Sequence, residues 1–263
     1  MKTKWFAMSH KVYFIGAGPG DPEMLTLRGL RALQSCHAVF APTPYEETFA
    51  EHLAGRPVFV PFDFYFDELL ERIRTLLQEG PVAFLIPGDL TFYAPFQGLI
   101  DALGDTAEVI AGVGTANAAS ARLKKTLDLP GVCKSAVITS PRTLGDGPDD
   151  PKLRDFARPG NTLLIYMNNL PLPELVAELR AGYGRDVPIA LVHRLALPGE
   201  EIVLGSLDTI AGKVGERDFF NLSPQIKKPA LTLVLVGETL AAHEDGTWWD
   251  YRRENIWRHQ DGA

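Results

Sequence analysis

The chain has 263 residues, of which 46% are hydrophobic and 22% charged, and this composition excludes a chain that is disordered throughout. Two domains are expected at this length, because one domain usually holds about 100 to 150 residues. The formal net charge of −7 argues against nucleic acid as the main partner, since phosphate binding depends on clustered Lys and Arg.

Membrane, secretory and metal-binding classes also find no support in the sequence. The longest apolar runs, such as Val82–Ile86, have the length of strands and are too short to cross a bilayer. No targeting signal is recognisable, because the first ten residues are polar and lead directly into an apolar run, so we expect a cytoplasmic protein. Cys36 and Cys133 lie far apart, which favours two buried thiols over a disulfide, and no metal site is expected.

The first half of the chain predicts three strands that each lead into a glycine-containing loop. The strands are expected at 12–15, 82–86 and 108–110, and the loops at 16–21, 87–93 and 111–117. In a parallel sheet with crossover helices such loops meet at the carboxyl edge of the strands, where open α/β folds bind ligands. The three loops are therefore expected to form one ligand site.

The first loop is similar to a dinucleotide-binding fingerprint but departs from it. Its glycines, between residues 16 and 20, allow a ligand to approach the backbone closely. The fingerprint requires a further glycine where this chain has Asp21, and a carboxylate there would repel a pyrophosphate. Pro19 and Pro22 also lack the N–H groups that would bind phosphate. Asp21 is expected to shape its own loop, and a turn without any ligand is the simpler alternative.

Helices and further strands complete an alternating α/β pattern. In the first half we expect helices at 26–35, at 67–78 and from residue 116, and short strands at 38–41 and 58–61. After a break at 129–131 the pattern restarts, with strands at 162–166, 188–192, 201–204 and 230–236 and a helix at 173–180. The expected domains are residues 1–128 and 129–263.

The ordered set of segments resembles the tetrapyrrole (corrin/porphyrin) methylase family, which consists of methyltransferases that use S-adenosylmethionine. The resemblance extends from Val12 to about Leu240, and its most specific part is the stretch 13–29, YFIGAGPGDPEMLTLRG. Supporting matches lie at 87–89 with Phe92 and Tyr93, at 109–116, at 164–167 and at 229–237. The resemblance implies an α/β fold of two domains with the active-site cleft between them, and a homodimer.

By position, the resemblance implies ten contacts to S-adenosylmethionine. They are Pro19, Pro87, Gly88, Asp89, Phe92, Thr115, Ala116, Met167, Leu195 and Ala230. The Asp89 carboxylate can accept hydrogen bonds from an ammonium group or ribose hydroxyls, and Met167 offers an adaptable apolar surface to an adenine ring. The structural alternatives are that Asp89 only forms a turn and that Met167 only fills the core.

A tetrapyrrole intermediate bears many carboxylates, so an acidic protein needs a local basic lining to bind it. Candidate substrate contacts are Tyr93, Arg122, Arg142, His193 and Arg194, with Lys124, Lys125, Lys227 and Lys228 as further cations. Solvated surface side chains are the alternative for most of them. No catalytic residue is assigned, because the cofactor carries the reactive methyl group, leaves as S-adenosylhomocysteine, and requires the protein mainly for positioning.

The expected function is S-adenosylmethionine-dependent C-methylation of a corrin or porphyrinoid intermediate, at a precorrin-4 or cobalt-precorrin-4 step of cobalamin biosynthesis. Uroporphyrinogen methylases are disfavoured, because they carry an acid soon after the second strand, where this chain has 41-APTP-44. The segment 29–45 is similar to diphthine synthases, so methylation of a protein or peptide is one alternative. A cofactor-binding protein without catalysis is another.

The segment 248–258 contains tryptophans interleaved with arginines and matches nothing in the family. It could stack on a macrocycle or pack on a partner subunit. A terminal helix that packs on its own domain is the simpler expectation.

Overall fold

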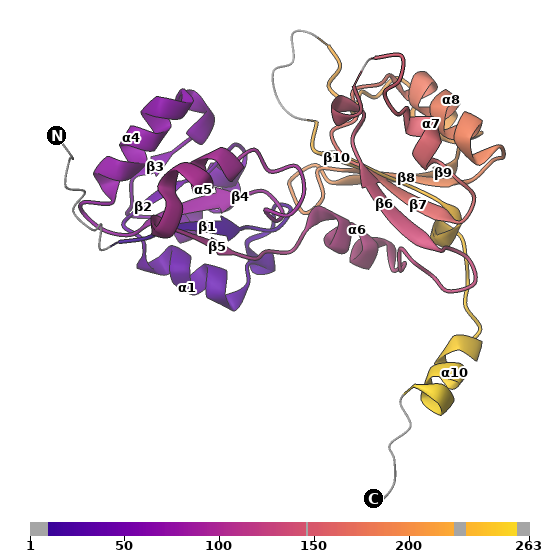
Figure 1. Ribbon diagram of the computed structural model, residues 1–263, viewed down its shortest axis with the longest axis horizontal. Helices are drawn as coiled ribbons and strands as arrows, with labels where there is room; N and C mark the ends of the chain where they lie inside the picture. The colour runs from indigo at the N-terminus through magenta and orange to yellow at the C-terminus, as the bar shows by residue number, and fades with distance from the viewer. Residues whose placement is uncertain (1–9, 146, 224–229, 257–263) are drawn as a thin grey trace, which may run out of the picture. The chain divides into compact units, whose positions relative to one another are not determined.

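The computed structural model describes residues 10–145, 147–223 and 230–256. Contacts within the chain divide it into two units, each built on its own five-stranded sheet (Figure 1). The first unit takes the residues up to Ala119 together with Arg194–Glu200, and the second takes Ser120–His193 and the residues from Glu201 onward. The sequence predicts two domains, residues 1–128 and 129–263, that each fold independently, and this stays a prediction.

The sheet of the first unit is entirely parallel, in the order β3-β2-β4-β1-β5. Its strands are β1 (Val12–Gly16), β2 (Ala38–Phe40), β3 (Val58–Phe59), β4 (Val82–Ile86) and β5 (Ala107–Ile110). These strands confirm the pattern expected from the sequence. The central strand β1 pairs with β4 on one side and with β5 on the other, so the three glycine-containing loops leave the sheet next to one another.

Helices cover both faces of this sheet (Figure 1). They are α1 (Leu27–Ser35), α2 (Tyr45–Thr48), α3 (Ala50–Leu53), α4 (Phe66–Leu76) and α5 (Gln97–Leu103), with short 3₁₀ turns at Pro22–Met24, Pro61–Asp63 and Gly104–Thr106. Helix α6 (Thr115–Leu123) follows the third glycine-containing loop, begins in the first unit and ends in the second. The Thr26 hydroxyl accepts a hydrogen bond from Gly29 N at 3.0 Å, which starts α1 at the expected residue.

Two hydrophobic clusters fill the first unit, one on each face of the sheet, because successive strand residues point to opposite faces. Phe14 and Phe84 belong to the cluster under α4 and α5, with ring centroids 5.3 Å apart. Ile15 and Leu85 belong to the cluster under α1. Both faces of β1 and β4 are therefore dry, as the continuous apolar run of β4 predicts.

The sheet of the second unit is mixed, in the order β6-β7-β10-β8-β9. Its strands are β6 (Ser135–Thr139), β7 (Asn161–Ile165), β8 (Pro188–His193), β9 (Glu201–Ser206) and β10 (Thr232–Val236). Only β6 and β7 run parallel, and the other neighbours are antiparallel. Sequence patterning does not predict β6, an edge strand whose apolar run is only three residues long and whose first two residues are exposed.

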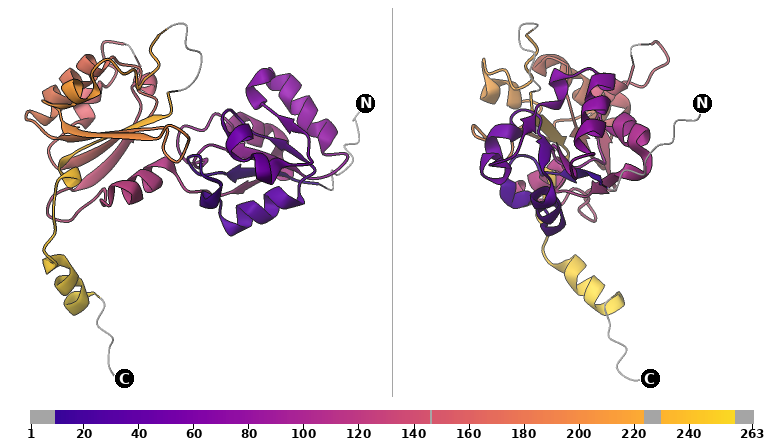
Figure 2. Two further views of the ribbon diagram at one scale, coloured as in Figure 1. Left: turned by 180° about the vertical axis from the view of Figure 1, so that it is seen from behind. Right: turned by 90° about the vertical axis from the view of Figure 1, so that its left-hand side faces the viewer.

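Helices α7 (Leu153–Phe156), α8 (Leu172–Tyr183) and α9 (Ile210–Val214) share one hydrophobic cluster with the second sheet. The ribbon in Figure 2 shows the helices of residues 153–183 along one side of this sheet. Further short turns lie at Pro141–Thr143 and Glu238–Leu240. A Cβ on Gly182 would lie 2.4 Å from the Arg154 carbonyl oxygen, so glycine permits the close packing of α8 on α7.

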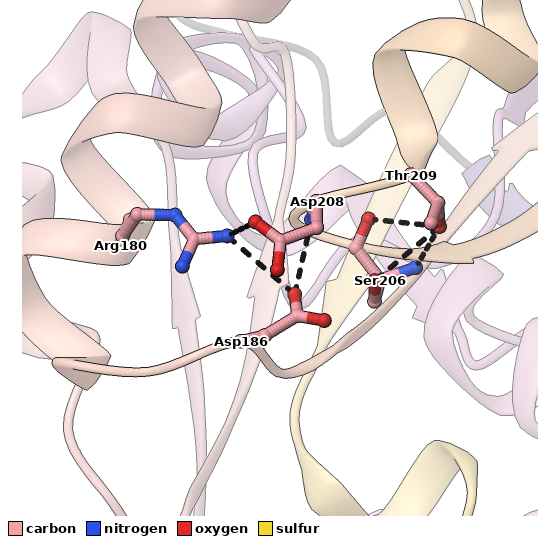
Figure 3. Close-up of polar contacts among 5 residues, drawn as sticks. All are labelled: Arg180, Asp186, Ser206, Asp208 and Thr209. Carbon is pink, nitrogen blue, oxygen red and sulfur yellow. Dashed lines mark hydrogen bonds and ion pairs between the residues drawn. The ribbon is translucent and has the colours of Figure 1, made fainter.

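A polar cluster ties the end of α8 to the strands that follow it (Figure 3). The Arg180 guanidinium pairs with Asp208 and lies 3.6 Å from Asp186. Asp208 N donates to the Asp186 carboxylate at 3.0 Å, and Ser206 N donates to the Thr209 hydroxyl at 2.9 Å. Because these groups are exposed, the cluster fixes the turn geometry more than it adds to the free energy of unfolding.

The C-terminal segment forms α10 (Thr247–Asn255), which confirms the expected helix. None of its residues is buried, so the expected packing on its own domain is wrong for the described part of the segment. Helix α10 carries arginines and tryptophans and contains too few aliphatic side chains to enter the core of the second unit. Trp257 and Arg258 lie outside the described residues. Among the helices that the structure describes, none is long and apolar enough to span a membrane.

Candidate active site

The first two glycine-containing loops are joined by a reciprocal pair of backbone hydrogen bonds. Gly18 N donates to the Gly88 carbonyl at 3.0 Å, and Gly88 N donates to the Gly18 carbonyl at 2.7 Å. Both residues have positive φ angles, of 74° and 69°, which glycine adopts without steric cost. The expected convergence of these two loops is therefore confirmed.

Asp89 joins the second loop to the third. One carboxylate oxygen accepts Gly112 N at 2.8 Å, and the other accepts Thr91 N at 2.9 Å together with the Thr91 hydroxyl. Partial burial acts to raise the pKa of Asp89, but the hydrogen bonds outweigh it, and the pKa lies below its ordinary value. Asp89 thus forms a turn, as the structural alternative proposed, and also bridges two loops.

The first and third loops approach so closely that neither position can carry a side chain. A Cβ on Gly16 would lie 2.5 Å from Gly112 N, and a Cβ on Gly112 would lie 2.5 Å from the Gly16 carbonyl carbon. All three loops therefore form one rigid cluster at the carboxyl edge of β1, β4 and β5.

Tyr45 supports this cluster from the core. Its hydroxyl donates to the Gly18 carbonyl at 2.7 Å, and its side chain is buried against Phe49, with ring centroids 5.5 Å apart. Burial raises the pKa of Tyr45 above its ordinary value, so the hydroxyl stays protonated and keeps donating. Sequence reasoning did not identify Tyr45, since a lone tyrosine after a strand gives no signal of such a contact.

The segment Arg194–Glu200 belongs to the first unit and packs on the first loop. A Cβ on Gly20 would lie 2.8 Å from the Ala196 carbonyl oxygen, a backbone atom that cannot turn away, so this close contact favours glycine. The segment holds its own shape, because Ala196 N donates to the Glu200 carboxylate at 2.7 Å. The predicted cofactor contact Leu195 is buried within this segment.

In the second unit, Arg142 and Met167 lie together. Arg142 Nε donates to the Met167 carbonyl at 3.1 Å. The Met167 side chain is 42% exposed, so the alternative that it only fills the core is wrong. Its position after β7, rather than within it, removes it from the core.

His193 is oriented by a short hydrogen-bonded chain at the end of β8. The Thr232 hydroxyl donates to the Phe219 carbonyl at 2.5 Å and lies 2.7 Å from His193 Nδ1. Because the single hydroxyl proton of Thr232 is directed at a carbonyl, His193 Nδ1 is the donor in the second contact. A fully solvated His193 is therefore excluded.

The structure places the remaining predicted residues as follows. In the first unit, the buried residues are Pro19, Gly88 and Ala116, and the half-buried ones are Thr115, Tyr93 and Arg194. Pro87 and Phe92 of the same unit are exposed. In the second unit, Ala230 is half-buried, whereas Arg122 and Arg142 are exposed. Lys124 is exposed, whereas Lys125 donates to the Ala242 carbonyl at 2.6 Å. Lys227 and Lys228 lie outside the described residues.

Backbone strain marks several of these positions. Tyr93, Met167 and Arg194 have positive φ angles although they are not glycines, as do Ala196 and Leu231, the neighbours of two predicted cofactor contacts. Such conformations are costly for residues with a Cβ and gather at functional sites. No sequence signal could identify them, since nothing in these residue types announces the conformation.

Cys36 and Cys133 are buried free thiols, as expected. Burial raises the pKa of the Cys36 thiol to about 11, which keeps it protonated and unreactive at neutral pH. Within the described ranges, no three His, Cys, Asp or Glu side chains are grouped so that they could hold a metal ion.

Comparison with known proteins gives a family match over most of the chain. The sequence model of the family described as Tetrapyrrole (Corrin/Porphyrin) Methylases matches residues 11–211. The cobalt-precorrin-4 C(11)-methyltransferase of Methanocaldococcus jannaschii is 32% identical over 239 residues, which cover 88% of this chain and 89% of that protein. The precorrin-4 C(11)-methyltransferase of Pseudomonas aeruginosa is 32% identical over 257 residues, which cover 95% and 99% of the two chains.

Solved structures agree with this match. A cobalt precorrin-4 methyltransferase, CbiF, superimposes with a TM-score of 0.72 at 24% identity, covering 88% of this chain and 95% of that one. The uroporphyrin-III C-methyl transferase of Thermus thermophilus, complexed with S-adenyl homocysteine, gives a TM-score of 0.65 at 27% identity and covers 88% and 99% of the two chains. Both sheets are thus part of a fold found in other methyltransferases.

Proposed function

Because the chain belongs to the tetrapyrrole (corrin/porphyrin) methylase family, we propose that it transfers a methyl group from S-adenosylmethionine to C11 of precorrin-4 or cobalt-precorrin-4 in cobalamin biosynthesis. The chain is a methyltransferase of tetrapyrroles. The precorrin-4 step rests on one observation, which is that two relatives named for it are 32% identical over nearly their whole length.

The residues of the first unit fit S-adenosylmethionine. Gly88 has no side chain, so a ligand can approach its backbone closely. It also lies against Thr115, another proposed cofactor contact, since a Cβ on Gly88 would lie 3.1 Å from the Thr115 hydroxyl. One carboxylate oxygen of Asp89 already accepts two hydrogen bonds from Thr91, but the other accepts only Gly112 N among the described contacts and has capacity for an ammonium group or a hydroxyl. The exposed ring of Phe92 offers an apolar surface. Bound there, the cofactor supplies an electrophilic methyl group.

In the second unit, the exposed Met167 side chain is proposed to contact the adenine ring. Arg142, which is fixed by the Met167 carbonyl, is proposed to bind a substrate carboxylate, since a guanidinium retains further donors after one hydrogen bond. His193 is proposed as a substrate contact whose ring orientation is set by Thr232. The remaining cofactor and substrate contacts named from the sequence are proposed with the same roles.

The protein's work in this reaction is to hold two reactants in line and to exclude water from the reacting atoms. The rigid cluster of three glycine loops suits the first task, because hydrogen bonds and close backbone contacts connect all three. A homodimer and a cytoplasmic location complete the proposal.

Cofactor binding is tested by titration calorimetry of the full chain with S-adenosylmethionine and S-adenosylhomocysteine. Binding in the micromolar range or tighter is expected, equivalent to about −8 kcal/mol or better. S-adenosylmethionine that produces neither heat nor a thermal shift would contradict the proposed methyl donor.

The substrate is tested by incubating the protein with cofactor carrying a labelled methyl group and, separately, precorrin-4, cobalt-precorrin-4 and uroporphyrinogen III. Mass spectrometry should show one added methyl on a precorrin-4 substrate, and NMR should place it on C11. Methylation of uroporphyrinogen III alone would move the chain to another step, while cofactor binding without methylation of any of the three would favour a different acceptor.

A further inference from the structure

Helix α10 presents one basic and aromatic face to solvent. An α-helix turns by about 100° per residue, so some of the side chains of α10 form one stripe about 140° wide along the helix. This stripe consists of Trp248, Trp249, Arg252, Arg253 and Ile256. Asp250 and Glu254 fall on the opposite side. Trp249 is 75% exposed and none of the helix residues is buried. We name this stripe the basic aromatic face.

This face needs a covering surface. An isolated helix of nine residues is marginal in water, since nucleation is costly and few backbone hydrogen bonds form. Internal contacts stabilise it only locally, because Trp248 stacks on Tyr251 at 5.2 Å and Arg252 lies 5.9 Å from the Trp248 ring. Tryptophan and arginine are also the residue types that most often dominate protein interfaces.

A second exposed surface in the first unit has the complementary composition. It runs from the turn before α4 into its first helical turn and consists of Phe62, Asp63, Tyr65, Phe66, Asp67 and Glu68. Phe62 and Tyr65 are 67% and 83% exposed, and the three acidic side chains are exposed as well. We name this surface the acidic aromatic patch.

The patch has a defined shape rather than a loose one. Phe62 packs on the Phe96 ring with centroids 6.0 Å apart, and Tyr65 N donates to the Glu68 carboxylate at 3.1 Å. Grouped exposed aromatics of this kind mark an interaction surface on a soluble protein. Three carboxylates beside them would repel a polycarboxylate such as a tetrapyrrole and attract arginines.

We propose that the basic aromatic face of α10 docks on the acidic aromatic patch of a second copy of this chain. Both surfaces carry exposed aromatic rings, their charges are opposite, and one contact between them would cover both. In a dimer with two-fold symmetry the contact is made twice, which doubles the buried area. The proposal concerns assembly and is independent of the substrate assigned above.

The test uses two variants of the full chain, one with Tyr65→Cys and one with Ile256→Cys. Both positions are exposed, and the native Cys36 and Cys133 are buried, so a short bis-maleimide should react at the introduced thiols. The mixture is expected to form a covalent species of two different chains. Glu254→Cys, on the opposite side of α10, is the matched control and should cross-link at least tenfold less.

Charge reversal sharpens the test. Arg252→Glu with Arg253→Glu in the Ile256→Cys chain should lower the cross-linking yield at least tenfold, and Asp63→Lys with Asp67→Lys in the other chain should restore it. No cross-link between the two chains, or a yield insensitive to the charge reversal, would overturn the proposal. Methyl transfer by the unmodified chain is measured in parallel, so that failure of the proposed reaction is recognised separately. If the arginine changes raise KM for the tetrapyrrole and no cross-link forms, α10 serves the substrate and the proposed docking is wrong.

Discussion

At the scale of single residues, Asp89 is predicted to matter more than Asp21, the other acid in the glycine loops. Asp89→Ala leaves the Gly112 N–H without its acceptor and should lower the free energy of unfolding by about 1–2 kcal/mol. It should also weaken S-adenosylmethionine binding at least tenfold in calorimetry. The Asp21 carboxylate accepts Glu23 N, within its own turn, so Asp21→Ala is the matched control with the smaller effect on binding. The opposite ranking would mean that the cofactor lies at another loop.

The lowered pKa of Asp89 also predicts how pH acts on the first unit. Its carboxylate is favoured in the folded state, so its contribution to stability is complete above the ordinary pKa of 3.8 and is lost as pH falls through the lower folded value. Thermal unfolding of the wild type and of Asp89→Asn should differ at pH 7, and the difference should begin to shrink only as pH falls below 3.8. A difference that persists unchanged at pH 3 would show that the carboxylate charge is not what stabilises the loops.

At the scale of elements, the close approach of β1 to the third loop predicts an intolerant pair of glycines. Gly112→Ala brings a Cβ within 2.5 Å of the Gly16 backbone, which cannot yield as a flexible side chain would, and should cost about 1–3 kcal/mol or more and abolish cofactor binding. Gly212→Ala is the control: it lies within α9 with no atom near its Cβ position and should stabilise by about 0.5–1 kcal/mol. Chemical denaturation of both variants measures the two changes in the free energy of unfolding, and equal changes would contradict the packing argument.

At the scale of the whole molecule, each described hydrophobic cluster lies inside one unit, which predicts two unfolding steps. Leu179→Ala, in the core of the second unit, should lower the free energy of unfolding of that unit by about 2–5 kcal/mol and shift one calorimetric transition to lower temperature. Phe84→Ala, in the core of the first unit, should lower the other by about 3–5 kcal/mol. A single transition that both substitutions shift equally would show that the chain unfolds as one cooperative unit.

Much of this protein follows from its sequence alone. Continuous apolar runs such as Val82–Ile86 predict buried strands, and glycines after three strands predict a shared ligand edge, because burial and steric freedom are properties of the residues themselves. The long match at 13–29 predicts the family. Strand β6 and helices without a clear apolar stripe could not be predicted, since they are stabilised by neighbours distant in the chain.

Only the tertiary structure decided how the candidate site is held together. The bonds from Gly112 to Asp89 and from Tyr45 to Gly18 join residues 23 and 27 positions apart, and no local pattern specifies such pairs. The same is true of the strained backbone at Met167 and of its exposed side chain, which the sequence left open between core and cofactor contact. The sequence by itself determined which loops meet and which family the chain belongs to, because both depend on residue type and order. The hydrogen bonds that make the loops one rigid cluster depend on distances that exist only after folding.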